Sequence, residues 1–128
     1  MNSMFQKLSL TAIVAAAFST AALALVPSQF QGVWETKEWF GTIARMQVVE
    51  CAPDGPYCIQ VHSLVQGDGL SPGDLFATSL DPRGTDLRSG SMKIPNGPTL
   101  PVGLFYVNEN QLRLESFGTK EVWERVPQ

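Results

Sequence analysis

The spacing of short β-prone runs is the feature that most limits what this chain can fold into. After residue 24, runs rich in Val, Ile, Leu and aromatic residues recur at hairpin spacing, and Gly, Pro, Asn and Asp separate them. A surface helix would need an apolar period of 3.6 residues, and we find none in this part of the sequence. The expected strands cover 32–36, 42–51, 57–65, 75–80, 87–94, 102–107, 111–116 and 120–126.

Seven or eight short strands without a crossover helix predict an antiparallel meander, either closed as a small barrel or folded as a sandwich. We favour an all-β, up-and-down antiparallel barrel, because closure removes exposed sheet edges. Pro95 and Pro101 interrupt the weak middle of the series. We therefore expect one side of the barrel to be irregular or open.

Alternation along the expected strand 57–65 assigns its two faces. Ile59, Val61 and Val65 lie on one face, and Gln60 and His62 lie on the other. We expect the apolar face to point inward. His62, the only histidine, is then a surface or structural residue, and a base or metal ligand is the alternative reading.

The two cysteines, Cys51 and Cys58, flank a strong turn sequence at 53–56 (PDGP). In an oxidising compartment we expect them to form a disulfide across the neck of a hairpin. A metal pair and a redox pair are the alternatives. Zinc would need two more ligands, and a redox pair usually has C-x-x-C spacing beside the start of a helix.

Residues 1–24 have the pattern of a secretory signal peptide. Lys7 precedes the apolar run 8–23, and Ala22 and Ala24 supply the small residues that cleavage after residue 24 requires. A short membrane anchor is the alternative, but it usually needs about 20 apolar residues. We expect one exported domain, residues 25–128, in the periplasm or secreted.

The charge balance argues against polyanionic partners. Lys7 is the only charged residue of 1–24, so the rest of the chain keeps eight of the nine basic residues and all twelve acidic residues. A mildly acidic chain without Lys/Arg clusters is poorly suited to bind nucleic acid or anionic lipid through phosphate contacts. We expect a monomer, with no nucleic-acid partner and no stable membrane insertion of residues 25–128.

Two motifs suggest how the ends of the chain meet. The sequence G-x-W stands at 32–34 and W-x-R-V at 123–126. This pair resembles the lipocalin-like (calycin) barrels, and the resemblance implies that Trp34 plugs the closed end while Arg125 lies across its ring. Such a stack contributes about 0.5 to 2 kcal/mol. Gly32, Trp34, Trp123 and Arg125 are therefore the expected structural residues.

The order of motifs along the chain is also similar to a family of small exported bacterial proteins, domain of unknown function 2147. G-x-W, an alternating strand that reaches Cys51, Cys58 followed by an apolar strand, and a final W-x-R-V occur in that order. Residues 90–97 (GSMKIPNG) form a shortened version of the family's glycine-rich segment. The resemblance implies the fold and export, and it implies no activity.

Candidates for catalysis and metal binding are few. The segment 67–69 (GDG) with Asp74 faintly suggests calcium ligation, but the spacing differs from an EF-hand loop. Glu35 and Glu38 could act as a pair of glycosidase carboxylates, but three residues apart on a strand they should point to opposite faces. We expect no catalytic residue, no metal site and no cofactor.

Aromatic side chains are the best candidates for binding. Trp39 and Phe40 lie in the expected loop after the first strand, where both cannot point inward. With Tyr57 and Phe105 they are the candidate ligand-binding residues of a barrel mouth. We expect a non-catalytic binding module of the bacterial envelope that holds a small apolar or amphipathic ligand or an envelope component. The alternatives are a periplasmic protein-binding barrel, such as a protease inhibitor, and an envelope-acting hydrolase.

Overall fold

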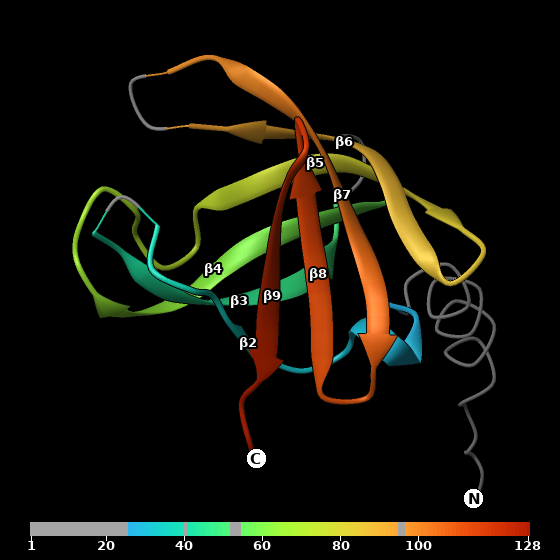
Figure 1. The fold of residues 1–128 in the computed structure, drawn as a ribbon, viewed down its shortest axis with the longest axis horizontal. Helices are drawn as coiled ribbons and strands as arrows, with labels where there is room; N and C mark the ends of the chain where they lie inside the picture. The colour runs from blue at the N-terminus through green and yellow to red at the C-terminus, as the bar shows by residue number, and fades with distance from the viewer. Residues whose placement is uncertain (1–25, 40, 52–54, 95–96) are drawn as a thin grey trace, which may run out of the picture.

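Eight antiparallel strands form one closed barrel (Figure 1). The computed structural model describes residues 26–39, 41–51, 55–94 and 97–128. The elements are the 3-10 helix η1 (Ser28–Phe30) and strands β2 (Trp34–Glu35), β3 (Ile43–Glu50), β4 (Tyr57–Gln66), β5 (Leu75–Arg83), β6 (Asp86–Lys93), β7 (Thr99–Asn108), β8 (Gln111–Ser116) and β9 (Thr119–Arg125). The predicted all-β barrel is confirmed, whereas the expected signal peptide, 1–24, lies outside the described residues.

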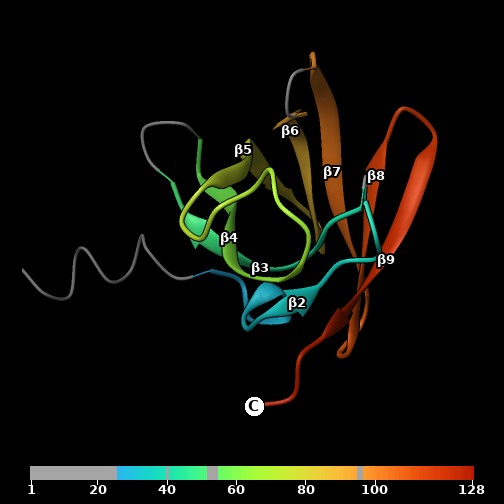
Figure 2. The same ribbon diagram turned by 90° about the vertical axis from the view of Figure 1, so that its left-hand side faces the viewer.

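Every strand pairs with the next one along the chain, and β2 pairs with both β3 and β9 (Figure 2). The closing ladder is short: Trp34 lies opposite Met46 on one side and opposite Arg125 on the other. In the described part of the chain, no helix is long and apolar enough to cross a membrane.

The barrel remains closed at Pro101, where we expected an irregular or open side. Pro101 belongs to β7 and lies opposite Ser91 of β6. The ladder between β7 and β8 begins only at Gly103, opposite Glu115. A proline is tolerated here because β7 has one strand partner at this point, so fewer ladder hydrogen bonds are needed. Pro95 lies outside the described residues.

A register shift changes which residue of β4 points inward near its end. Bulges between Ile43 and Ala44 and between Arg45 and Met46 displace the β3–β4 register. Leu64 packs against the core, whereas Val65 is exposed. The expectation that Val65 shares the inner face with Val61 was therefore wrong, because a one-residue slip reverses the two faces of a strand.

Trp34 anchors the base of the barrel, the end at which β2 begins and β9 ends. Its side chain is fully buried, and its indole Nε1–H donates to the carbonyl oxygen of Phe30 at 3.1 Å. Phe30, the last residue of η1, is itself fully buried. Burying an indole removes a large apolar area from water while its polar N–H keeps a partner. Trp34 thus connects the segment before the barrel to the core.

Arg125 covers the Trp34 ring and joins three chain segments. Its Cζ lies 4.2 Å from the ring centroid, Nη1 donates to the Gln31 carbonyl at 2.6 Å, and Nε donates to the Glu109 carbonyl at 2.6 Å. Gly32 makes this approach possible: its φ is +108°, and a Cβ there would lie 2.6 Å from Nη1. Gly32, Trp34 and Arg125 of the two end motifs therefore form one cluster at the base.

The interior between base and middle is filled by apolar side chains. The largest fully buried ones come from every strand and from η1: Trp34, Trp123, Phe30, Met46, Ile59, Leu80, Leu87, Leu104, Leu112 and Val61. Because inward and outward side chains alternate along each strand, this filling follows from the alternating apolar pattern.

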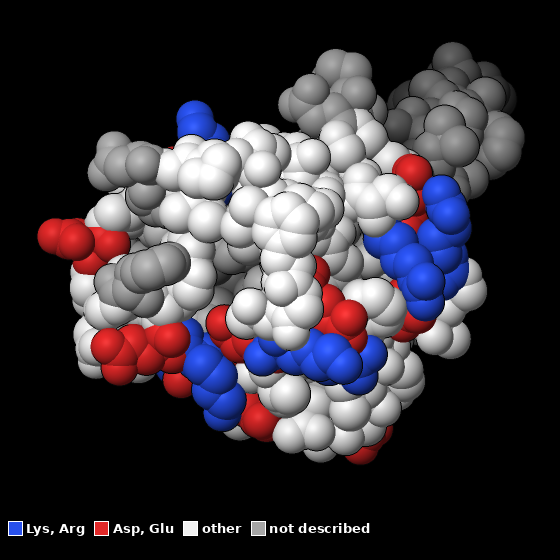
Figure 3. Space-filling model, turned by 45° about the horizontal axis from the view of Figure 1, so that its top comes forward, with Lys and Arg blue, Asp and Glu red and all other residues white. Residues whose placement is uncertain are grey.

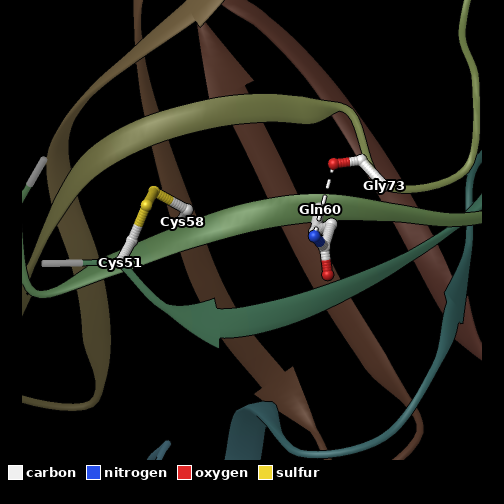
Figure 4. The surroundings of a disulfide bond; sticks show 4 residues. All are labelled: Cys51, Cys58, Gln60 and Gly73. Carbon is white, nitrogen blue, oxygen red and sulfur yellow. Dashed lines mark hydrogen bonds between the residues drawn. A yellow bond between two sulfur atoms is a disulfide. The ribbon is translucent and has the colours of Figure 1, made fainter.

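Cys51 and Cys58 form a disulfide between the end of β3 and the start of β4 (Figure 4). Their Cα atoms are 5.4 Å apart, which is an ordinary separation for a bridged pair. The Cys51 N–H also donates to the Pro56 carbonyl at 3.1 Å, so the neck of this connection is held twice. The predicted pairing is present; residues 52–54 of the turn lie outside the described residues.

Replacing Cys51 with alanine should lower the free energy of unfolding by about 2 kcal/mol and leave the barrel intact, because the unfolded chain loses a short covalent loop. Cys51 is the better site for the substitution, since Cys58 is fully buried and its removal would add a cavity. Urea unfolding followed by tryptophan fluorescence measures the change. Reduced wild-type protein should match the variant, and two reactive thiols in the unreduced native protein would contradict the bridge.

A Gly32→Ala substitution should destabilise the protein more than Gly41→Ala. Both glycines have positive φ, but only Gly32 faces a neighbouring group that a Cβ would strike. The part of the cost due to that contact, about 1 kcal/mol or more, should disappear in an Arg125→Ala background. Urea unfolding of the four combinations of Gly32→Ala and Arg125→Ala measures this coupling. Additive free energies would mean that Gly32 is not needed for the arginine's approach.

Candidate functional site

The two ends of the barrel differ in what closes them. The base carries η1, the disulfide-linked connection, the two-residue turns at 84–85 and 109–110, and Arg125. The opposite end, which we call the mouth, carries the connections 36–42, 67–74 and 94–98 and the turn at Phe117 and Gly118. Figure 2 looks towards the mouth, with the 36–42 and 67–74 connections nearest the viewer. The mouth therefore carries the two longest connections between strands.

Three aromatic rings form the floor of the mouth. The ring centroids of Trp39 and Phe76 are 5.5 Å apart, and those of Phe76 and Trp123 are 6.1 Å apart. These distances are typical of favourable edge-on and tilted ring contacts. A void next to this floor, shared with Ala44 and Met46, measures only about 10 Å³, which is scarcely enough for one water molecule. Below the rings the barrel is packed.

Hydrogen bonds hold the mouth connections in place. Trp39 and Thr42 exchange backbone hydrogen bonds of 2.7 and 2.9 Å, and this tight turn orients the indole of Trp39. The Thr42 hydroxyl donates to the carbonyl of Asp68 at 2.9 Å, which joins the 36–42 connection to the 67–74 connection. Gly67 is required at that crossing, because a Cβ there would lie 2.5 Å from the Gly41 carbonyl oxygen. These contacts tie the described residues of the two connections to one another.

Above the floor lies a hollow of about 390 Å³, which we call the mouth hollow. Its walls are mainly apolar and come from the 36–42 and 94–98 connections and from the mouth ends of β6, β7, β8 and β9. The lining residues are Glu38, Trp39, Met92, Ile94, Leu100, Leu114, Ser116, Phe117, Thr119 and Glu121.

Glu121 places a carboxyl group at the boundary between the floor and the mouth hollow. Its Oε2 accepts a hydrogen bond from Trp123 Nε1–H at 2.6 Å and another from the Lys37 backbone N–H at 3.2 Å. Glu121 lines both the small void and the mouth hollow. The side chain therefore connects β9 to the segment after β2 and presents a carboxyl group to a mainly apolar space.

Burial raises the pKa of Glu121 above its ordinary value of 4.5, because a desolvated carboxylate is less stable than a hydrated one. The hydrogen bonds from Trp123 and Lys37 and the positive charge of Lys37 oppose this shift without cancelling it. A carboxyl group whose charged form is short of stabilising partners is a common property of ligand sites.

The structure separates the four aromatic residues predicted to bind a ligand. Trp39 lines the mouth hollow, and Phe40 lies outside the described residues. Tyr57 begins β4 at the base, next to the disulfide, and packs partly against the core. Phe105 lies on the outer wall, where Cζ of Arg88 and Arg113 are 5.0 and 5.1 Å from its ring centroid. Only Trp39 of the described three belongs to the mouth.

The other polar candidates have local partners. His62 is exposed, and its Nδ1 lies 3.1 Å from the Ser63 hydroxyl. Asp74 accepts the Ser71 backbone N–H at 2.8 Å, as a turn residue does. Glu35 pairs with Arg45 at 3.2 Å, whereas Glu38 lines the mouth hollow. Within the described ranges, no three His, Cys, Asp or Glu side chains are arranged to hold a metal ion.

Sequence reasoning missed Glu121, although the sequence contained the information. Trp123 and Arg125 were expected to be structural residues, and strand alternation puts Glu121 on the same face as both of them. The motif at the end of the chain is therefore better described as E-x-W-x-R, with the carboxyl at the mouth, the indole in the floor and the guanidinium at the base. The contributions of Met92, Ile94 and Leu100 had no comparable pattern in the sequence.

Wild-type protein should lose stability relative to a Glu121→Gln variant as the pH rises from about 4 to 7. Because the folded-state pKa is raised, the contribution of Glu121 to folding is fully present below 4.5 and is lost as the pH rises through the folded-state value. Glutamine cannot titrate, so the difference in free energy of unfolding isolates this group.

Urea unfolding of both proteins at several pH values measures the trend. Glu124→Gln removes an exposed carboxylate of the same strand and controls for the loss of one negative charge. A difference between wild type and Glu121→Gln that stays constant, or that moves the other way, would contradict the raised pKa.

No family model, no curated protein and no solved structure matches this chain. The resemblance to domain of unknown function 2147 therefore stays a prediction.

Proposed function

We propose that this protein is an exported, non-catalytic binding barrel that holds one small apolar or amphipathic molecule in its mouth. The observation that carries the proposal is the mouth hollow, an apolar space of about 390 Å³ directly above a packed aromatic floor. Small-molecule sites in proteins are typically concave, mostly apolar and of roughly 300 to 1,000 Å³.

The size of the mouth hollow limits the ligand. At roughly 30 Å³ per non-hydrogen atom, the volume share of a water molecule in the liquid, about a dozen atoms fit. The interior below Trp39 and Phe76 is filled, so the ligand would lie across the mouth rather than deep in the barrel. A larger amphiphile would leave its remaining part outside.

The rim of the mouth supports an apolar ligand as well. Phe117 is 74% exposed and lines the mouth hollow from the turn between β8 and β9. Its φ is +47° and that of Gly118 is +77°, values at which a two-residue turn usually has Asn or Gly. An aromatic ring is thus held near solvent in a backbone conformation that is unfavourable for it. Covering this ring with a ligand would remove apolar surface from water.

The proposed export depends on the signal-peptide pattern of residues 1–24, and the disulfide is compatible with an oxidising compartment. We do not propose a protease inhibitor that inserts its N-terminal segment into an enzyme. Val26 packs against the core of its own barrel, and its carbonyl accepts a hydrogen bond from the Gln31 side chain at 2.8 Å.

A series of 1-alkanols from butanol to hexadecanol tests the proposal. Each added CH₂ should tighten binding about fourfold, from about 0.8 kcal/mol of transfer free energy, until the mouth hollow is full. Beyond a total of about a dozen non-hydrogen atoms, further carbons should add little. Ligand-dependent thermal stabilisation measures the affinities.

A Leu100→Trp variant should reach its limit at a shorter alkanol, because the larger side chain occupies part of the mouth hollow. Tyr106 of β7 is not among the residues that line the mouth hollow. The control variant Tyr106→Trp introduces an indole outside the hollow and should leave the chain-length limit unchanged. If no alkanol stabilises the wild-type protein, the proposed function fails.

A further inference from the structure

We propose that the natural ligand of the mouth hollow is a primary or secondary ammonium compound with a short apolar tail, and that Glu121 receives its N–H groups. This inference rests on the proposed function and specifies the ligand class. It makes Glu121 a specificity-determining residue, while the apolar walls supply most of the affinity.

The charges around the mouth hollow favour a cationic ligand over an anionic one. Two of its described lining residues are charged, Glu38 and Glu121, and both are acidic. The remaining lining residues are apolar or carry a hydroxyl group, so the described walls offer no cationic side chain to an anionic ligand. An anionic headgroup would therefore meet two like charges, whereas a cationic headgroup would meet two opposite ones.

The hydrogen bonds of Glu121 leave one of its carboxylate oxygens available to a ligand. Both protein donors, Trp123 Nε1–H and the Lys37 backbone N–H, bond to Oε2. Among the described residues the hydrogen bonds to this carboxyl end on Oε2, and Glu121 forms none of the ion pairs found there. A carboxylate oxygen accepts more than one hydrogen bond, so an ammonium ligand has an acceptor available.

The partial burial of Glu121 means that its carboxylate would gain stability from a ligand cation. Desolvation disfavours its charged form, and the existing hydrogen bonds compensate only in part. A ligand ammonium placed against Oε1 would supply the missing stabilisation, and a hydrogen bond between two charged groups is stronger than a neutral one. The ring of Trp39, which lines the same space, can add a cation–π contact.

The ammonium group of Lys37 could compete with a ligand ammonium for Glu121, but the position of Lys37 limits this competition. The backbone N–H of Lys37, rather than its ammonium group, bonds to Glu121, and Lys37 is exposed to solvent. Lys93 lines a neighbouring hollow with Asp74 and Phe76, beside the mouth hollow rather than in it. Neither side chain is among those that line the mouth hollow.

Long-range electrostatic attraction by the whole surface explains a preference for cationic ligands less well than local contacts do. In Figure 3 basic and acidic side chains lie next to one another rather than in separate fields of one sign. The formal net charge of the full sequence is only −3. A cation should therefore be selected by the groups it touches in the mouth hollow, and selection should survive salt that screens longer-range attraction.

Three probes of equal carbon number test the inference: octylammonium, 1-octanol and octanoate, each titrated at neutral pH and followed by thermal stabilisation and calorimetry. Wild-type protein should bind octylammonium about tenfold more tightly than 1-octanol, and octanoate most weakly. The preference for octylammonium should persist in about 0.5 M salt.

The Glu121→Gln variant should lose the tenfold preference for octylammonium over 1-octanol. Glutamine keeps an oxygen that can accept the Trp123 N–H, so the local structure has a means to persist. Glu124→Gln, which removes a negative charge from the outer face of the same strand, should keep the preference. The wild-type comparison of the three probes stands even if Glu121→Gln fails to fold.

Each outcome has a separate meaning. Equal binding of the three probes, tighter binding of octanoate, or a preference that Glu121→Gln retains would overturn the ammonium assignment and leave the proposed binding function in place. Failure of all three probes to bind would overturn the proposed function itself. A preference that disappears in salt for wild type would assign it to general electrostatic attraction and overturn the role of Glu121.

Discussion

The contact between the Trp34 indole and the Arg125 guanidinium is the interaction on which this barrel depends. β2 has only two residues, so the ladders that close the barrel are the shortest in the structure. Side-chain contacts reinforce this short closure, beside the backbone bonds from Val126 to Val33 and from Thr36 to Ala44. Arg125 stacks on Trp34 and at the same time donates to carbonyls before β2 and between β7 and β8. Gly32 is part of the same device, because only a residue without Cβ leaves room for the guanidinium.

Because the contacts at the base stabilise the barrel, the mouth does not have to be packed as tightly as the core. The largest buried side chains fill the interior up to the ring of Trp123, and the disulfide holds another base connection. At the other end the chain keeps an apolar hollow, a partly desolvated carboxyl and an exposed aromatic ring in a turn with positive φ. None of these features stabilises a fold by itself. Three such departures from good packing therefore occur together at the mouth.

Much of the fold could be predicted because hydrophobic alternation and turn residues act locally. All eight strands lie close to their expected positions, and the cysteines that flank the predicted turn are bridged. The errors arose where one strand's neighbours decide the outcome. Val65 is exposed because bulges in the pairing with β3 reverse its face. The side at Pro101 is irregular as expected, because β8 pairs with β7 only farther along, but the barrel stays closed. Such register effects depend on two segments at once, so neither segment reveals them alone.

For the site, the sequence by itself determined which residues lie on the inner and outer faces of the better strands. It also determined the turn chemistry and the overall charge. Only the tertiary structure decided that Phe105 lies on the outer wall between two arginines and that Glu121 meets the Lys37 backbone N–H. It also decided that space remains above the aromatic floor. The physical reason is that alternation is a property of one strand, whereas a hollow and a desolvated charge arise only where several strands converge.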